Sequence, residues 1–356
     1  MSWKKKLFFS LLSTALIVVL GNLCCALGER LAYGAFWGQD RPKGLYIHQT
    51  GERPRLQPNA SLNGWLYQIS INSLGFRGKE LENPKPKDSF RIWCMGGSTT
   101  FDIFSDTDDN TWPAQTEQIL TGKFPAKKIE VLNAGVPGEV LFGSTEDFRA
   151  YQKDIRADAV VIYHGPNDLR QLLAAPRQQQ LAHQQKQMGK ADHQSPFGFI
   201  LDRKDFVLIR VLRRNLKESL PIPSEWDKNQ MSQQQLNDMR RRLEQTIQTV
   251  RRNRAIPILA THALKGQDGD TGAIAKNRVA ETTSLLRMPP EQVIKTFYDY
   301  NQMVRALAVK YKTPVADVRT AVGPQEENWG DGTHFAPPGS ALAAEEVARA
   351  ISEIIK

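Results

Sequence analysis

Compact apolar runs alternate with amphipathic stretches from residue 89 to the C-terminus. Five of these runs predict buried strands, because each is short, rich in aliphatic side chains and bounded by turn residues. They are Phe90–Met95, Lys128–Leu132, Ala159–Tyr163, Ala255–Ala260 and Pro314–Val318. Helical spacing of apolar residues predicts helices at Trp112–Leu120, Thr145–Tyr151, Leu236–Val250 and Ser340–Ile355. This alternation indicates an α/β protein with a parallel sheet between two layers of helices.

A longer apolar run lies at the N-terminus. It extends from Leu7 to about Leu27 behind Lys4–Lys6, and about 20 such residues are enough to span a bilayer. The lysines favour a cytoplasmic N-terminus, which places the rest of the chain outside the cytoplasm. The alternative is a cleaved signal peptide with a small-residue site near Ala26-Leu27-Gly28. We expect a single-pass periplasmic membrane protein or, after cleavage, a secreted one.

The composition divides the chain into three parts. Residues 1–30 form the membrane anchor or signal segment. Residues 31–88 are rich in Gly, Pro and aromatic side chains, with one short predicted strand at Ile69–Ile71. We expect this accessory segment to wrap the main domain without a core of its own. Residues 89–356 form the main domain, interrupted at about 172–230 by a polar and basic insertion.

The insertion includes the Gln-rich stretch Gln178–Gln187 and the basic, amphipathic stretch Phe206–Arg214. Its basic residues form either a solvated face or a contact with a membrane or an acidic substrate. The whole chain has a formal net charge of +9, which either favours acidic partners or only keeps the protein soluble. No nucleic-acid-binding motif accompanies this charge, so we expect no nucleic-acid partner.

Candidate chemistry follows the predicted strands. Ser98 comes directly after Gly96-Gly97 at a strand-to-helix turn, where backbone N–H groups point toward a ligand. Asp331-Gly-Thr-His334 places a carboxylate three residues before a histidine, so that it can bond one ring nitrogen while the other faces a serine. Each motif by itself is also a common turn. Together they provide the nucleophile, base and orienting acid that acyl transfer requires.

Two further strand ends carry candidate donors for an oxyanion. Gly135 lies in Asn133-Ala-Gly-Val-Pro-Gly, and its N–H lacks an obstructing side chain. Asn167 lies in Gly-Pro-Asn-Asp and offers a side-chain amide. His164 and His262 also follow strands and could line the pocket, but neither has an obvious orienting acid, which favours a structural role.

Other motifs are missing from the sequence. No serine stands in Gly-x-Ser-x-Gly, which argues against an α/β-hydrolase. There is no His-Glu-x-x-His, no Cys–His cluster, no Walker A loop and no Gly-x-Gly-x-x-Gly. We therefore expect no metal and no nucleotide cofactor. Cys94 lies alone inside a predicted strand, which is typical of a small core residue and not of a nucleophile.

Taken in chain order, Gly-Gly-Ser98, Gly135, Gly-Pro-Asn167-Asp and Asp331-x-x-His334 resemble the four sequence blocks of the SGNH/GDSL hydrolase superfamily. Asn72-Ser-Leu-Gly-Phe-Arg-Gly and Thr111-Trp-Pro are similar to segments of exported bacterial members. One departure is Gly-Gly-Ser-Thr where Gly-Asp-Ser-Leu stands in the older signature. The resemblance covers about Ile71 to the C-terminus.

The resemblance implies a three-layer α/β/α sandwich with a five-stranded, flavodoxin-like parallel sheet. It implies Ser98 as nucleophile, His334 as base and Asp331 as its orienting acid. It also implies an oxyanion hole from the backbone N–H groups of Ser98 and Gly135 and the side chain of Asn167. No cofactor is implied.

Three functions remain open at this stage. The first is a serine esterase or deacylase that acts on an extracytoplasmic acylated glycan or lipid. The second is an O-acyltransferase of a cell-envelope polysaccharide, which uses the same acyl-enzyme with a sugar acceptor. The third is a binding protein that keeps the fold without catalysis.

Overall fold

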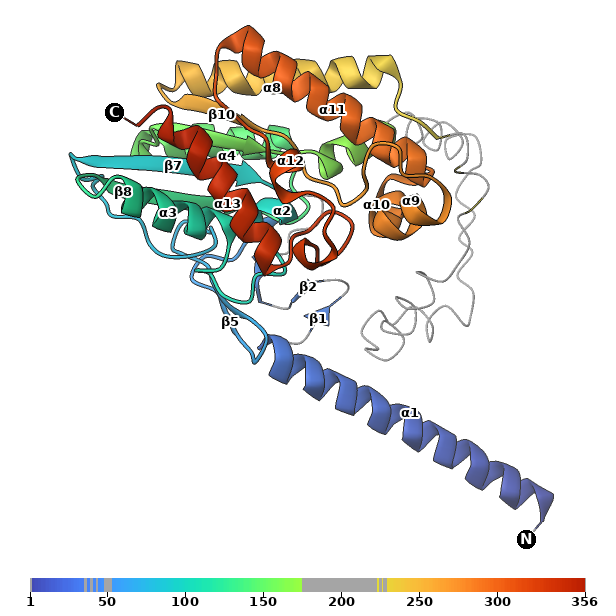
Figure 1. Ribbon diagram of the computed structural model, residues 1–356. Helices are drawn as coiled ribbons and strands as arrows, with labels where there is room; N and C mark the ends of the chain where they lie inside the picture. Colours follow the sequence, from blue (N-terminus) through green and yellow to red (C-terminus); the bar gives the residue numbers. More distant parts are fainter. Residues whose placement is uncertain are drawn as a thin grey trace, which may run out of the picture.

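Helices cover both faces of a central sheet, and one long helix projects from this body (Figure 1). The structure is a computed structural model that describes residues 2–34, 37–38, 41–42, 44–47, 53–174, 223, 226 and 229–355. Most of the predicted insertion, with Gln178–Gln187 and Phe206–Arg214, lies outside these residues.

The sheet has five parallel strands in the order β11-β10-β9-β7-β8. Their bounds are β7 Ser89–Gly96, β8 Lys128–Gly135, β9 Ala159–Tyr163, β10 Ile256–Ala260 and β11 Val315–Ala316. In chain order of the five strands this is 2-1-3-4-5, the order of the flavodoxin-like sheet. The structure therefore confirms the predicted fold class. The strand order reverses between β7 and β9, and ligands bind at such a switch point, beyond the carboxyl ends of the strands.

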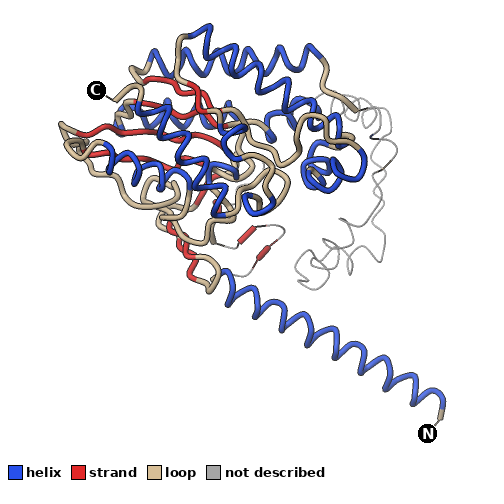
Figure 2. The backbone as a smooth tube through the Cα atoms, viewed as in Figure 1, coloured by secondary structure: helices blue, strands red, loops and turns tan. Residues whose placement is uncertain are grey.

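Two apolar cores hold the helices against the sheet. On one face α3 and α13 pack around Trp112, Leu120 and Val347. On the other face α4, α8 and α11 pack around Phe148 and Ile247. Figure 2 shows these helices on both sides of the strands. The helices of the main domain are α2 Ser98–Phe101, α3 Trp112–Lys123, α4 Leu141–Ile155, α8 Gln233–Arg252, α9 Gly272–Arg278, α10 Ala280–Leu286, α11 Pro290–Tyr311, α12 Val318–Val322 and α13 Pro337–Ser352, with a short 3-10 helix η2 at Glu326–Asn328.

The last strand is shorter than the sequence predicts. Pro314–Val318 was the expected range, but β11 contains only Val315 and Ala316, and α12 begins at Val318. The strand ends because the Asp317 N–H donates to the Glu346 side chain at 2.6 Å and not to a neighbouring strand. The closing helix also begins earlier than expected, at Pro337, and ends at Ser352.

The accessory segment forms three short antiparallel hairpins. They are β1 Trp37–Gly38 with β2 Arg41–Pro42, β3 Tyr46–Ile47 with β4 Arg55–Leu56, and β5 Ser61–Asn63 with β6 Gln68–Ser70. Apolar side chains of this segment, including Leu45, Leu62 and Ile69, are buried together with Phe101 and Val136 of the main domain. The segment thus has a small apolar cluster, which it shares with the residues that follow β7 and β8.

The N-terminal run forms α1, Trp3–Tyr33. Within Trp3–Ala32 the apolar 18-residue window has a mean hydropathy of 2.2, and none of that window is buried. The helix is long and apolar enough to cross a membrane, a property shared by anchors and signal sequences.

Candidate active site

Ser98 lies at the carboxyl end of β7, where the chain turns into α2. The turn needs glycine, because a Cβ at Gly96 would lie 2.0 Å from Thr100 Oγ1 and 2.5 Å from the Tyr163 carbonyl oxygen. Ser98 is the first residue of α2, so its backbone N–H has no acceptor within the helix. Among the described residues this N–H donates to no other group. It is therefore free to bind a ligand oxygen.

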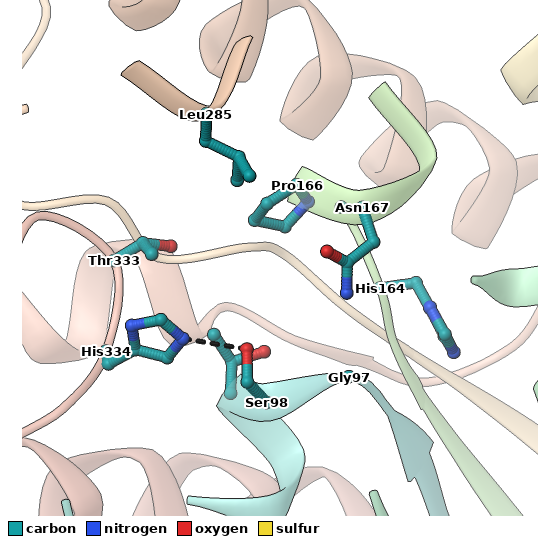
Figure 3. A pocket seen from close by; sticks show the side chains of 10 residues that line it. Gly97, Ser98, His164, Pro166, Asn167, Leu285, Thr333 and His334 are labelled. Atoms are coloured by element: carbon teal, nitrogen blue, oxygen red, sulfur yellow. Dashed lines mark hydrogen bonds between the residues drawn. The ribbon is translucent and has the colours of Figure 1, made fainter. Parts of the chain in front are cut away.

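The Ser98 hydroxyl is hydrogen-bonded to His334 (Figure 3), with 2.7 Å between Oγ and Nε2. The other ring nitrogen, Nδ1, lies 2.7 Å from Oδ2 of Asp331. Oδ1 of Asp331 accepts the N–H groups of Thr333 and His334 at 2.9 and 2.8 Å. These bonds fix the carboxylate, which in turn fixes the ring orientation. Serine, imidazole and carboxylate thus form one continuous hydrogen-bonded relay.

The electrostatics of this relay favour an ionised Asp331. Burial raises the pKa of the Asp331 carboxyl, but the hydrogen bond and charge of His334, with the two backbone N–H donors, outweigh it and hold that pKa below its ordinary value. An ionised carboxylate beside Nδ1 stabilises a protonated imidazole. The geometry therefore permits His334 to take a proton from Ser98 and hold it.

Asn167 approaches Ser98 from the first turn of the helix that follows β9, which begins at Pro166. Its Nδ2 donates to the Glu139 carbonyl oxygen at 3.0 Å, which holds the amide in place and leaves its second hydrogen available. A Cβ at Gly97 would lie only 2.7 Å from this Nδ2, so glycine permits the close approach. In Figure 3 the amide nitrogen is directed toward the Ser98 side of the pocket.

Gly135 does not lie where the sequence analysis expected. It is buried within β8, its N–H donates to Asn133 Oδ1 at 3.1 Å, and it does not line the pocket beside Ser98. Gly138, three residues later, is also outside the lining of this pocket. Gly138 has φ +87° and donates its N–H to no acceptor among the described residues. It precedes Glu139, the residue that Asn167 bonds, and is the better candidate for a backbone donor.

The two other histidines that follow strands, His164 and His262, have different surroundings. His164 does have an acid partner, since its Nδ1 lies 3.2 Å from Asp168 Oδ2, so the expectation of no orienting acid is wrong for this residue. Figure 3 shows its ring turned away from Ser98. His262 is fully buried and stacked on Tyr163 with 4.7 Å between ring centroids. Burial lowers the pKa of His262 to about 3, which keeps it neutral.

Arg77 is a residue whose role the sequence analysis missed. Its side chain is fully buried and donates all five N–H groups within 2.8–3.0 Å, a full set for a guanidinium. The acceptors are the carbonyl oxygens of Phe101, Asp102, Ser105 and Thr107 and the carboxylate of Asp108. Arg77 thus fixes the loop that follows the nucleophile helix. The only sequence signal was the motif Asn72–Gly78, which resembles a family segment.

Replacement of Arg77 by Met is expected to lower the free energy of unfolding by about 3–5 kcal/mol, because it removes five hydrogen bonds of a buried guanidinium, four to carbonyl oxygens and one to the partly exposed carboxylate of Asp108. Urea unfolding of the full chain in detergent measures this change. Arg149→Met is the matched control. The side chain of Arg149 is 61% exposed beside Glu146, so its loss should change stability by less than about 1 kcal/mol. Equal effects of the two replacements would contradict the role of Arg77.

Neither cysteine nor metal chemistry is supported by the described part of the chain. Cys94 is buried in the core between sheet and helices, and burial raises the pKa of its thiol, as expected for a core residue. Within the described ranges no three His, Cys, Asp or Glu side chains are grouped in a way that could hold a metal ion.

Comparisons with known proteins show the family of the chain. The profile of the GDSL-like lipase/acylhydrolase family matches residues 94–342, and the chain therefore belongs to this family. It is a family of carboxylic ester hydrolases, also called SGNH hydrolases. No curated protein sequence matches the chain.

Solved structures that are similar to this chain include three bacterial proteins. A lipase/acylhydrolase from Enterococcus faecalis is 16% identical, with 75% of this chain and 97% of that chain covered and a TM-score of 0.42. An acetyl xylan esterase from Geobacillus stearothermophilus is 14% identical, with 75% and 96% covered and a TM-score of 0.41. A lipolytic G-D-S-L family protein from Veillonella parvula is 11% identical, with 75% and 100% covered and a TM-score of 0.43. The family assignment depends on the family profile and not on these overall similarities.

Replacement of Asn167 by Ala is expected to lower kcat by about 10²–10³-fold, because an oxyanion donor acts mainly on the transition state. KM should change much less. Steady-state hydrolysis of a chromogenic acetate ester measures both constants. Replacement of Asn237 by Ala is the control, because Asn237 lies on α8, where its Oδ1 accepts from Gln233 at 3.4 Å, and it does not line the pocket. A loss confined to KM would contradict the role proposed for Asn167.

Proposed function

We propose that this protein is a serine esterase that removes a short acyl group from an extracytoplasmic glycan or lipid. Ser98 is the nucleophile, His334 the base and Asp331 the residue that orients the base. The observation that carries the proposal is the relay from Ser98 Oγ through His334 to Asp331, with 2.7 Å at each hydrogen bond.

The reaction proceeds through an acyl-enzyme. Ser98 Oγ attacks the ester carbonyl carbon while its proton passes to His334 Nε2, and Asp331 stabilises the resulting imidazolium. The carbonyl oxygen becomes an oxyanion, to which the Ser98 N–H, the Asn167 amide and the Gly138 N–H donate. His334 returns the proton to the departing alcohol. Water then attacks the acyl-Ser98 carbonyl by the same route and releases the carboxylic acid.

The size of the pocket supports a short acyl group. The cavity beside Ser98 has a volume of about 30 Å³, which accommodates roughly two water molecules. Pro166 and Leu285 lie on the side opposite Ser98 and His334 (Figure 3). A carbonyl and one methyl group fit this space, whereas a long alkyl chain requires the lining side chains to move. We therefore propose an acetyl ester as the substrate.

We further propose that α1 remains as a membrane anchor. Its apolar length supports a span, and Lys4–Lys6 at its start favour a cytoplasmic N-terminus. The catalytic domain then acts on the extracytoplasmic side, where acylated envelope glycans and lipids are found.

A substrate panel tests this function. The full chain in detergent is incubated with p-nitrophenyl acetate, butyrate and laurate and with an acetylated polysaccharide, and acid release is followed. We expect kcat/KM to fall by at least tenfold from acetate to laurate, and acetate release from the polysaccharide to require Ser98. Addition of a non-acetylated acceptor glycan distinguishes hydrolysis from transfer. Preference for laurate would contradict the acyl group proposed here, and acetylated acceptor in place of free acetate would indicate a transferase.

A further inference from the structure

The hairpin of β5 and β6 ends in an exposed apolar tip beside the end of α1. Trp65 is 82% exposed and Leu66 is 55% exposed. Their backbone N–H groups donate to the carbonyl oxygens of Leu31 and Ala32 at 2.8 and 2.9 Å. These carbonyls belong to the last turn of α1, which an isolated helix leaves without partners. The hairpin therefore satisfies the C-terminal end of the apolar helix.

The contact between hairpin and helix is close enough to require glycine on both sides. A Cβ at Gly64 would lie 2.2 Å from the Ala32 carbonyl oxygen, and a Cβ at Gly34 would lie 2.4 Å from the backbone nitrogen of Asn63. Both of these neighbours are backbone atoms, which cannot rotate aside. The end of α1 and the hairpin thus pack as one unit, and the position of α1 in a bilayer determines the position of the tip.

The length of the helix sets that position. The apolar run Leu7–Leu27 is about 32 Å long at 1.5 Å per residue, which matches a hydrocarbon core of about 30 Å. Leu31 and Ala32 lie four and five residues further, about 6–8 Å beyond the core. This depth falls in the headgroup region, where tryptophan is enriched because its ring is apolar and its N–H is polar.

We propose that the tip Gly64–Tyr67 inserts into the lipid interface and gives the catalytic domain a second contact with the bilayer. The inference rests on the proposal that α1 remains as an anchor. Its partner is the lipid surface itself, which covers the exposed side chains of Trp65 and Leu66.

This second contact restricts how the active site faces the membrane. β6 is attached to the loop after the nucleophile helix, since Gln68 N donates to the Asp106 carbonyl oxygen and Ser70 N to Asp108 Oδ2 at 2.6 and 2.8 Å. Arg77 holds the same loop. A helix alone permits the domain to tilt and rotate above the bilayer, whereas a helix with an inserted tip fixes one orientation.

Photo-crosslinking to lipid tests the proposal. The full chain is reconstituted into phosphatidylcholine/phosphatidylglycerol vesicles that contain a lipid with a diazirine near the glycerol, irradiated and digested with trypsin. We expect lipid adducts on the peptide Leu56–Arg77, which contains the tip. The peptide Ile129–Arg149 is the internal control, because it contains Phe142, which is 64% exposed on α4 in the main domain. The double variant Trp65→Ser/Leu66→Ser should lose at least tenfold of the adduct on residues 56–77.

The outcomes separate the tip from the anchor. Vesicle flotation reports whether α1 is retained and inserted, and ester hydrolysis in detergent reports whether the double variant is folded. Flotation with no adduct on Leu56–Arg77, or with an equal adduct on Ile129–Arg149, overturns the inserted tip and leaves the anchor standing. Failure of the wild-type chain to float overturns the anchor and the tip together.

Discussion

Ser98→Ala is expected to lower kcat by about 10⁶-fold, to the rate that binding and oxyanion donors alone sustain. The reason is the position of the hydroxyl. It is the group hydrogen-bonded to the Nε2 of His334, and without it no acyl-enzyme forms. Substrate affinity should change little, because the replacement removes one oxygen atom. Single-turnover hydrolysis of p-nitrophenyl acetate measures the loss.

Ser105→Ala is the matched control for this result. In the wild type the Ser105 hydroxyl donates to the Asn110 carbonyl oxygen at 3.0 Å, and Ser105 does not line the pocket. Its activity should remain within about threefold of wild type, because most such replacements away from a site have small effects. If the Ser98→Ala variant keeps more than a few per cent of activity while folded, the proposed nucleophile is wrong.

His334→Ala is expected to cause a loss of similar size, also about 10⁶-fold in kcat, because serine and base act as a unit. The losses in kcat caused by the two replacements should not multiply. The double variant Ser98→Ala/His334→Ala should be no slower than either single variant within a factor of about three. The Asp331→Asn variant should lose less, about 10⁴-fold, since the relay is weakened but its atoms remain.

A double-mutant cycle with stopped-flow or overnight assays measures these rates, and circular dichroism shows that each variant is folded. Independent, multiplicative effects of the two replacements would mean that His334 does not act through Ser98. Such a result would contradict the role read from the 2.7 Å contact, whatever the activity of each single variant.

The sheet was predictable because each strand is a compact apolar run that ends at a polar, Gly-containing motif. β9 has the predicted bounds Ala159–Tyr163, β7 is one residue longer than predicted at each end, and β10 begins one residue later. β8 continues three residues beyond its predicted end, to Gly135. Burial on both faces of a parallel sheet makes such runs continuous. β11 was overestimated, since its end depends on the long-range bond between Asp317 and Glu346.

The site was predictable where its chemistry is carried by side chains. Ser98, Asn167 and Asp331–His334 bring distinctive groups to strand ends. A backbone N–H donor cannot be recognised in this way, because every residue except proline has a backbone N–H. Gly-Val-Pro-Gly contains two glycines, and only the structure shows that Gly135 donates to Asn133 whereas no group in the described part of the chain accepts the Gly138 N–H.

Contacts between segments that are far apart in the chain could not be predicted from the sequence either. Arg77 binds backbone carbonyls 24–30 residues later, and carbonyl groups are present at every residue. The partner of His164 is Asp168, one turn away on the loop and helix that follow β9. The sequence shows the acid four residues later, but gives no indication that these two side chains face each other.

The most direct test of the account is the site of covalent labelling by a fluorophosphonate. The full chain is incubated with the probe at neutral pH, and the adduct is located by tandem mass spectrometry in the tryptic peptide Ile92–Lys123. We predict one adduct per chain, on Ser98, formed rapidly in the wild type and at least 10³-fold more slowly in His334→Ala. An adduct on another residue, or no adduct on a folded chain that still hydrolyses acetate esters, would contradict the account.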